Sequence, residues 1–445
     1  MKFKALTILI TFIKEITVGQ SKDQSHCLPP ALANGKANCP GKIIPGATCS
    51  VICNRGYIAT PGKGRANCQR DGSWDHALQC EIPVVVIAGG IGKVNGKTLV
   101  QRSGEILSLY PSQGCNITIR NMPKPYGTKR AFHNLIYTPG RGKLLVCNGI
   151  TGLFRQYPRA SCDQYLFKAE TWWRDSYPNE GMEKDYSCDF GHRPSTCMNP
   201  DRRKGRYAAQ AVVSDDIAYV VGGMLYDEAG HTPTRSSRIY VETGVPHIKD
   251  YWNLARKQKQ SRAFFCLVKV EEDGAFSIGG LGRIKNMNEV LKTMDFSVLS
   301  LNKSKSDLGP KYPNSFALMK RSRAGHSCTS LPIRNFTILV SGGTGGFGLP
   351  AEASAEIFSL EKNSWRNVGS MKKARFGHAV VNVGHKVFAI GGEDRENNNY
   401  FDSIEEFDVT KESWKIISQR IQTPRSNFGY TLIPHSLVDG CKILD

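Results

Sequence analysis

The chain contains no hydrophobic run long enough to cross a membrane. A membrane-spanning helix needs about 20 consecutive apolar residues. The apolar run near the N-terminus, Ala5–Ile13, has about half that length and is followed by Lys14 and Glu15. No later stretch is long enough to span a bilayer. We therefore expect no transmembrane segment.

The sequence also lacks the short motifs of common enzyme classes. It contains no G-x-S-x-G nucleophile elbow, no H-E-x-x-H zinc motif and no glycine-rich phosphate loop. Each of these motifs sets a nucleophile, a metal ligand or a phosphate contact at a fixed spacing. Scattered carboxylates such as Asp175 and Glu183 do not have a spacing that indicates a hydrolytic pair. We predict a non-enzymatic protein without a metal ion or other cofactor.

Acidic residues are few relative to basic ones. The chain has 59 Lys and Arg against 39 Asp and Glu, a formal net charge of +20 at pH 7. Such an excess favours polyanionic partners through long-range steering and counterion release. In an extracellular setting these are acidic glycans, acidic matrix and anionic cell surfaces, whereas nucleic acid is not expected there.

The N-terminal segment has the pattern of a secretory signal peptide. Lys2 and Lys4 precede the apolar run, and small or polar residues follow near Gly19. We interpret residues 1–19 as that signal and expect a secreted protein. Fourteen cysteines fit an oxidising compartment. Three N-x-Ser/Thr sequons are candidate glycosylation sites: Asn116, Asn302 and Asn335.

Six cysteines fall within residues 27–80, a span too short for a large apolar core. This density predicts a module held together by disulfides. The segment contains "CNRGY" at 53–57 and "DGSW" at 71–74. Its spacing resembles that of the sushi (complement control protein) family, and we expect the domain at 26–81.

The sushi resemblance implies two disulfides and leaves a further cysteine pair. The two disulfides are Cys27–Cys68 and Cys53–Cys80. Cys39 and Cys49 depart from the four-cysteine form but are similar to the extra pair of selectin-type sushi modules. Such a domain serves as a spacer or as an adhesive contact, and the sequence leaves both roles open.

Beyond this module, one pattern recurs at intervals of about 50 to 75 residues. Residues 375–394, "RFGHAVVNVGHKVFAIGGED", show it: an arginine, a short strand, a turn, and a second strand that ends in two glycines. Asn tolerates positive φ, so Asn148 can replace the first glycine of one pair. The six pairs are Gly89–Gly90, Asn148–Gly149, Gly222–Gly223, Gly279–Gly280, Gly342–Gly343 and Gly391–Gly392.

Units of this length with four short strands are typical of a β-propeller. Downstream strands add an aromatic residue seven positions before a tryptophan, as in Phe358–Trp365 and Phe407–Trp414, with Tyr165–Trp172 as a variant. The diglycine, the aromatic residue and the tryptophan resemble kelch repeats. We therefore predict an all-β protein, in which the sushi module precedes a six-bladed kelch-type propeller at 82–435 and a tail at 436–445.

The ring is expected to close through the C-terminal strand. The first glycine pair lacks a preceding arginine strand, whereas Arg425 opens a strand with no blade of its own. We expect this strand to be innermost in the blade formed by residues 84–119. Closure of this kind would bring Cys115 and Cys441 close enough for a disulfide.

The other propeller cysteines are less constrained by the sequence. We expect Cys188 and Cys197 to pair within the long link that follows Asp175. Cys147 and Cys162 bracket one loop, whereas Cys266 and Cys328 fall on innermost strands of successive blades. For these four, disulfides and buried free thiols both remain open.

The recurring arginines and the long basic loops are predicted to share one face. In a four-stranded blade, the connection into the first strand and the connection out of the second open on the same side. We predict a basic binding face formed by Arg130, Arg202, Arg203, Arg206, Arg262, Arg323, Lys372, Lys373, Arg375 and Arg425. The alternative is that the recurring arginines are structural and bond backbone carbonyls.

The predicted function is adhesion or extracellular matrix assembly through protein partners, acidic glycans or both. His133, His326 and His378 each follow a blade arginine by three residues, but a shared strand position explains them without metal. The alternative function is a copper-dependent carbohydrate oxidase similar to galactose oxidase. Those enzymes look like seven-bladed rings with a tyrosine–cysteine cross-link, and we find no matching set. The Asp-box turns of sialidase-type propellers are also absent.

Overall fold

The structure is a computed structural model, and its strands form two compact units. The units are Met1–Cys53 with Gly62–Cys80, and Asn54–Pro61 with Glu81–Asp445. Each unit is described by itself. The structure describes residues 26–109, 119–122, 129–139, 142–153, 158, 162–167, 171–174, 205–214, 217–227, 230–241, 251–254, 257–270, 274–284, 287–298, 315–333, 336–346 and 348–438.

The first unit is a small β-module with three disulfides. Its sheet has the order β1 (Gly35–Asn38), β2 (Thr48–Cys53), β4 (Arg65–Asn67). Strand β3 (Ile58–Ala59), which belongs to the second unit, pairs with β5 (Cys80–Glu81). The disulfides are Cys27–Cys68, Cys39–Cys49 and Cys53–Cys80, which confirms the implied pairing. The buried core of the module is small, so cross-links of this kind supply much of its stability.

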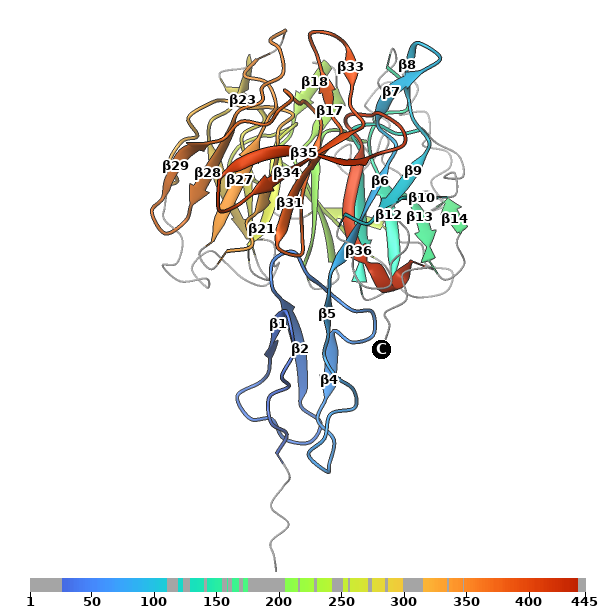
Figure 1. Cartoon of the computed structure of the whole chain (residues 1–445), viewed down its shortest axis with the longest axis vertical. Coiled ribbons are helices and arrows are strands. Elements are labelled where there is room, and N and C mark those ends of the chain that lie inside the picture. Colours follow the sequence, from blue (N-terminus) through green and yellow to red (C-terminus); the bar gives the residue numbers. More distant parts are fainter. Residues whose placement is uncertain are drawn as a thin grey trace, which may run out of the picture. The chain divides into compact units, whose positions relative to one another are not determined.

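The second unit is a β-propeller whose six sheets we number as blades 1 to 6 (Figure 1). From the innermost strand outward, blade 1 contains β36 (Gly429–Pro434), β6 (Pro83–Ala88), β9 (Gly104–Leu107) and β10 (Ile119–Met122). Blade 2 contains β11 (Asn134–Thr138), β12 (Lys143–Cys147), β13 (Cys162–Leu166) and β14 (Thr171–Arg174). Blade 3 contains β15 (Gln210–Ser214), β16 (Ile217–Val221), β19 (Ser237–Val241) and β20 (Tyr251–Leu254).

The remaining three blades follow the same order. Blade 4 has three strands among the described residues: β21 (Cys266–Val270), β22 (Gly274–Ile278) and β25 (Met294–Val298). Blade 5 contains β26 (Ser327–Ser330), β27 (Thr337–Ser341), β28 (Ala355–Ser359) and β29 (Ser364–Val368). Blade 6 contains β30 (Ala379–Val383), β31 (Lys386–Ile390), β34 (Ser403–Asp408) and β35 (Ser413–Arg420). A short 3-10 helix, His435–Leu437, follows β36.

Among the described residues, four two-stranded hairpins extend from the connections between the second and third strands of their blades. They lie at the same end of the propeller, which we call the hairpin face (Figure 1). The hairpins are β7–β8 (Ile91–Val94, Lys97–Val100), β17–β18 (Met224–Asp227, Gly230–Pro233), β23–β24 (Leu281–Ile284, Met287–Val290) and β32–β33 (Glu393–Asp394, Asn399–Tyr400).

The ring closes through the C-terminal strand, as predicted. β36 pairs antiparallel with β6 over six residue pairs, from Gly429↔Ala88 to Pro434↔Pro83. A separate hydrophobic cluster fills each of the six boundaries between neighbouring blades, including the boundary between blades 6 and 1. Each sheet therefore buries its faces against its neighbours, which no blade could do alone.

Two further disulfides resolve pairings that the sequence left open. Cys147–Cys162 joins neighbouring strands β12 and β13 within blade 2. Cys266–Cys328 joins innermost strands β21 and β26 of blades 4 and 5. The predicted pairs Cys115–Cys441 and Cys188–Cys197 lie outside the described residues, as does the predicted signal peptide at 1–19. Within the described chain, no helix has the length and apolarity needed to cross a membrane.

Candidate functional site

The six recurring arginines lie inside the blades. Their exposed fractions are 0 to 2%. In each blade the arginine Nη1 donates to the carbonyl oxygen of the first residue of the glycine pair, at 2.5 to 2.9 Å. This placement corrects the assignment of six residues to an exposed basic face, and it corresponds to the structural alternative: Arg130, Arg206, Arg262, Arg323, Arg375 and Arg425.

Five of these arginines form ion pairs with a carboxylate on the third strand of the same blade. The N–O distances are 2.7 to 3.2 Å. The pairs are Arg130–Asp163, Arg262–Asp295, Arg323–Glu356, Arg375–Glu405 and Arg425–Glu105. The sequence carried a signal for these partners, because a Ser/Thr-x-Asp/Glu triplet follows the arginine strand in four blades. In blade 1 the triplet ends at Glu105 and precedes Arg425 in the chain, and blade 3 has Arg238 at the acidic position.

The buried carboxylates also fix the loops that enter the blades. Glu405 accepts the backbone N–H groups of Lys372 and Lys373 at 2.6 and 3.1 Å in addition to Arg375. Glu356 does the same for Lys320 and Arg321. Each loop is thus held by its backbone, and its side chains remain available at the surface.

A closed cycle of backbone hydrogen bonds surrounds the propeller axis. The residue two positions after each arginine has a positive φ, between 52° and 63°. Each of these residues donates its N–H to the carbonyl of the equivalent residue in the neighbouring blade, at 2.7 to 2.9 Å. The six members of this axial cycle are Phe132, Ala208, Phe264, Gly325, Gly377 and Asn427.

The three histidines are packing residues on the innermost strands. His326 lies against Gly279 of the preceding blade so closely that a Cβ there would be 2.7 Å from its Cε1 atom. Phenylalanine occupies the equivalent position in two other blades: Phe265 of blade 4 lies against Gly222, and Phe428 of blade 1 lies against Gly391. Burial lowers the pKa of His133 and of His326 to about 3, and nearby arginines act in the same direction; the pKa of His378 also falls well below its usual value.

No group of three His, Cys, Asp or Glu side chains in the described chain is arranged to hold a metal ion. The histidines belong to separate blade boundaries, so they do not converge on one point.

Exposed basic side chains occur in the loops of the hairpin face. Lys372 is exposed, and Lys373 is half-buried with its Nζ 4.6 Å from the centroid of the Phe401 ring. Arg202 and Arg203 lie outside the described residues. Twelve further described cations belong to these loops: Lys93, Lys97, Arg102, Lys129, Arg235, Lys257, Lys259, Arg283, Lys292, Lys320, Arg321 and Arg395.

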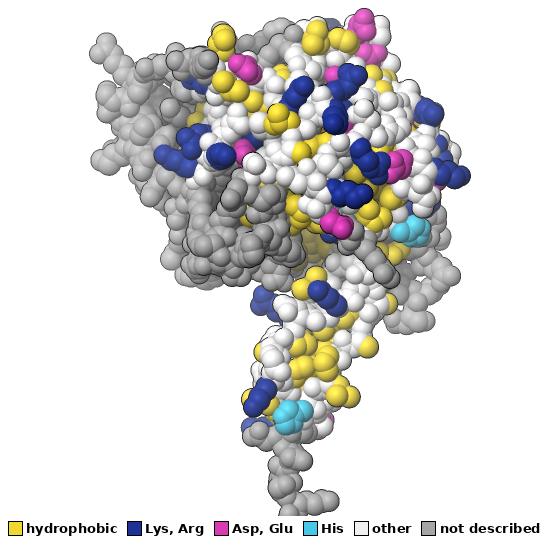
Figure 2. Space-filling view, turned by 90° about the vertical axis from the view of Figure 1, so that its left-hand side faces the viewer, with side chains coloured by type: hydrophobic (Ala, Val, Ile, Leu, Met, Phe, Trp, Pro, Cys, Tyr) yellow, Lys and Arg dark blue, Asp and Glu magenta, His cyan; other side chains and the backbone are white. Residues whose placement is uncertain are grey.

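Acidic side chains are fewer in the same loops. Those whose side chains are described are Glu289, Glu352, Glu393, Asp394, Glu396 and Asp402. Figure 2 shows one side of the molecule, where basic side chains are spread over the propeller and single acidic side chains lie between them. Among the described residues, the hairpin face therefore carries an excess of positive charge without the six buried arginines. The three candidate glycosylation sites, Asn116, Asn302 and Asn335, lie outside the described residues.

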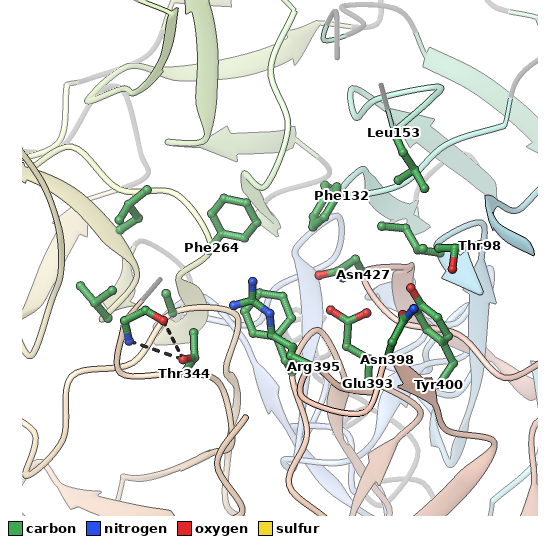
Figure 3. A pocket seen from close by; sticks show the side chains of 16 residues that line it. Thr98, Phe132, Leu153, Phe264, Thr344, Glu393, Arg395, Asn398, Tyr400 and Asn427 are labelled. Atoms are coloured by element: carbon green, nitrogen blue, oxygen red, sulfur yellow. Dashed lines mark hydrogen bonds between the residues drawn. The ribbon is translucent and has the colours of Figure 1, made fainter. Parts of the chain in front are cut away.

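A pocket of about 370 Å³ opens at the centre of the hairpin face (Figure 3). Members of the axial cycle line it, with Phe132 and Phe264 on one side and Asn427 between them and the polar residues. Ile91 and Leu281, each directly after a glycine pair, add apolar wall. No sequence motif marks these residues as a site, although their positions repeat in register with the arginines and glycine pairs.

The polar side of the pocket is formed by hairpin β32–β33 and its neighbours (Figure 3). The Ser426 hydroxyl donates to the Glu393 carboxylate at 3.0 Å, and burial raises the pKa of that carboxyl. Burial, together with the nearby Glu393 charge, raises the pKa of Tyr400 to about 12, so its phenol is neutral at pH 7. The Arg395 guanidinium lies 4.6 Å from the centroid of the Phe376 ring.

These features define a protein that combines a disulfide-rich module with a closed propeller of repeated blades. Residues 27–80 match the Sushi repeat (SCR repeat) family, and residues 374–419 match the Kelch motif family. The chain thus contains a sushi repeat followed by a kelch-type propeller, as the sequence predicted. Repeats of both kinds are typically protein-interaction modules, and the sushi repeat with its disulfides fits an extracellular protein.

Known proteins resemble this chain over part of its length. It is 32% identical over 81 residues to a RING finger domain and kelch repeat-containing protein of Dictyostelium discoideum, which is 18% of this chain and 8% of the relative. It is 26% identical over 110 residues to the F-box protein AFR of Arabidopsis thaliana, 25% of this chain and 28% of the relative. It is 29% identical over 87 residues to Kelch-like protein 15 of Gallus gallus, 19% of this chain and 17% of the relative. The chain thus spans less than a third of these relatives.

The solved structure of YjhT has a similar fold. The TM-score is 0.52 at 14% identity, and the match covers 76% of this chain and 99% of that chain. At this identity the likeness concerns the fold alone.

Proposed function

We propose that this is a secreted, non-enzymatic recognition protein whose propeller binds an anionic extracellular partner through the hairpin face. The observation that supports the proposal is the excess of exposed Lys and Arg side chains in the loops of that face. Backbone bonds to buried carboxylates hold two of these loops. A surface whose loops are already ordered loses little conformational freedom on binding.

Binding of an anionic partner through basic loops fits a function in adhesion or extracellular matrix assembly. The partner presents carboxylates or sulfates, on an acidic protein or on a glycan. The electrostatic fields of positively charged loops arranged around a ring add together and attract such groups. The sushi module acts as a second contact or a spacer, and two linked contacts strengthen binding through effective concentration.

Chromatography on heparin-agarose tests the proposal. We expect the protein to be retained at physiological salt, with retention that decreases steeply as salt rises. The double variant Lys320→Glu/Lys372→Glu reverses two exposed charges of the hairpin face and should elute at clearly lower salt. The matched control Lys362→Glu/Lys411→Glu reverses two exposed charges of the same two blades, in turns between their third and fourth strands.

Three outcomes would contradict parts of the proposal. Flow-through at physiological salt would remove the glycan partner, and an equal loss of retention in both double variants would remove the hairpin face as the site. Stoichiometric copper in the purified protein would instead favour the oxidase alternative.

A further inference from the structure

Glu393 is a carboxylate that lines the central pocket and has only neutral hydrogen-bond partners. Its donors include the Ser426 hydroxyl at 3.0 Å, together with Tyr400 and Asn427. In the described part of the chain, Glu393 takes part in no ion pair, although the charge of nearby Arg395 opposes the rise in its pKa. By contrast, the third-strand carboxylates Glu356, Glu405 and Glu105 each pair directly with a blade arginine. A half-buried carboxylate of this kind gains more from a cation than an exposed one, because little water solvates it.

The aromatic walls of the pocket accept positive charge. The Arg395 guanidinium already lies over the Phe376 ring, at 4.6 Å from the centroid. Across the pocket, the rings of Phe132 and Phe264 pack edge to face at 5.5 Å (Figure 3). The faces of aromatic rings attract ammonium and guanidinium groups, and the attraction grows when water is excluded.

The rest of the wall suits an apolar stem. Ile91, Leu153, Leu281 and Val290 are aliphatic residues that line the pocket. A ligand with a charged head and an aliphatic or aromatic body would contact both parts at once.

We propose that the central pocket binds an organic cation, a primary ammonium or guanidinium on an apolar stem, with the charge beside Glu393 and the stem against the apolar wall. The group comes either from a Lys or Arg side chain of a partner protein or from a free amine. This inference concerns the pocket and does not depend on the basic loops, so it can fail or hold independently of heparin binding.

Removal of the Arg395 side chain would have opposite effects at a cation site and at an anion site. This side chain is exposed and sits on the ring that a ligand cation would use. Its removal frees the Phe376 ring and takes away a like charge. An anion would instead lose its closest positive partner in the pocket.

Calorimetric titration of the full-length secreted protein tests the proposal. The probes are phenethylammonium chloride, Nα-acetyl-lysine amide and sodium 3-phenylpropionate. We expect Glu393→Gln to weaken binding of both amines about tenfold, as for the loss of one charge-assisted contact. Arg395→Ala should strengthen it about threefold, the size of an exposed charge interaction. The matched control Glu396→Gln makes the same charge change on an exposed residue of the same hairpin that does not line the pocket, and should leave binding unchanged.

The outcomes separate the alternatives. Binding of either amine with these signs supports the proposal, and the order of the two affinities distinguishes a partner side chain from a free amine. Tighter binding of phenylpropionate, weakened by Arg395→Ala, would overturn it in favour of an anion site. Absence of binding by both amines at millimolar concentration would overturn it as well. Thermal unfolding of each variant checks that the fold is kept.

Discussion

At the scale of the residue, the blade arginine combines charge with complete burial. A buried guanidinium is tolerated only when a counter-ion and several acceptors surround it. Arg375 has both: Glu405 pairs with it at 3.0 Å, and the Gly391 and Ser403 carbonyls accept from it. Burial lowers the pKa of Arg375, and the charge of Glu405 opposes that effect. Removal of one partner would leave an uncompensated charge in the interior.

The sequence could predict that an arginine recurs but not where its side chain lies. An arginine before a strand fits an exposed loop and a buried network equally well. The deciding partner, such as Glu356 for Arg323, follows 33 positions later in the same blade. A pattern that pairs the arginine with the later Ser/Thr-x-Asp/Glu triplet would have indicated burial, because a recurring pair of opposite charges is more easily explained by contact than by solvation.

The buried histidines predict acid sensitivity. The pKa of His326 is about 3 in the folded chain and close to 6.5 when unfolded. Between these values the unfolded state binds a proton that the folded state does not, so stability is complete above pH 6.5 and decreases as the pH falls. Each such histidine contributes a slope of up to about 1.4 kcal/mol per pH unit.

The variant His326→Phe tests this effect with the side chain that Phe265 supplies at the same position of blade 4. We expect similar stability at pH 7 and a shallower loss of stability between pH 6.5 and pH 4. The free energy of unfolding, measured by denaturant titration at several pH values, gives the slope. Parallel pH profiles for both proteins would show that His326 does not cause the acid sensitivity.

At the scale of the element, each glycine pair lets two blades approach closely at the end of a strand. The second glycine donates its N–H to the carbonyl of the next blade's arginine; Gly343 bonds Arg375 in this way at 2.8 Å. The first glycine has no room for a side chain, since a Cβ at Gly342 would lie 2.5 Å from the Arg375 carbonyl oxygen. Sequence could predict these pairs because glycine is the residue for which both demands are met.

The variant Gly342→Ala tests how much the close approach of two blades at this glycine costs a larger side chain in stability. Gly342 and Gly348 both have positive φ, at 67° and 76°, but a Cβ at Gly348 would contact nothing within 4 Å. Alanine at Gly348 should cost about 1–2 kcal/mol for the backbone conformation alone. Alanine at Gly342 should cost about 1–3 kcal/mol more, because the clash adds to it. Equal losses in the free energy of unfolding would show that the blade boundary relaxes around the added methyl group.

The pocket was harder to predict at this scale. The six axial positions carry Phe, Ala, Gly or Asn, so their residue types do not mark them as one set. Their equivalence lies in register alone, two positions after an arginine. The hairpin residues Glu393 and Tyr400 approach them because the ring brings connections from different blades to one axis.

At the scale of the whole molecule, closure joins segments more than 300 positions apart. The Arg425 side chain bonds the Gly89 carbonyl at 2.9 Å and pairs with Glu105. The blade count and the closing strand followed from the repeats, since an incomplete first unit and an extra last strand complement each other. The boundaries of the predicted domains, the signal peptide and the glycosylation sites stay predictions.

Shortening the chain tests closure directly. A protein that ends at residue 424 lacks β36, which leaves the inner edge of β6 unpaired and opens two blade boundaries. We expect it to show no cooperative thermal transition by circular dichroism. The control ends at residue 438 and carries Cys115→Ser, so it keeps β36 and has no unmatched thiol if Cys115 pairs with Cys441. A cooperative transition in the shorter protein would show that closure by β36 is dispensable.

The axial cycle of hydrogen bonds has one more consequence. Open arrays of repeats fray from their terminal units, and they require special capping units with a polar outer surface. In this propeller each of the six axial residues has a neighbour on both sides, and Asn427 links back to Phe132. The array therefore has no first or last member from which unravelling could start, and it needs no cap.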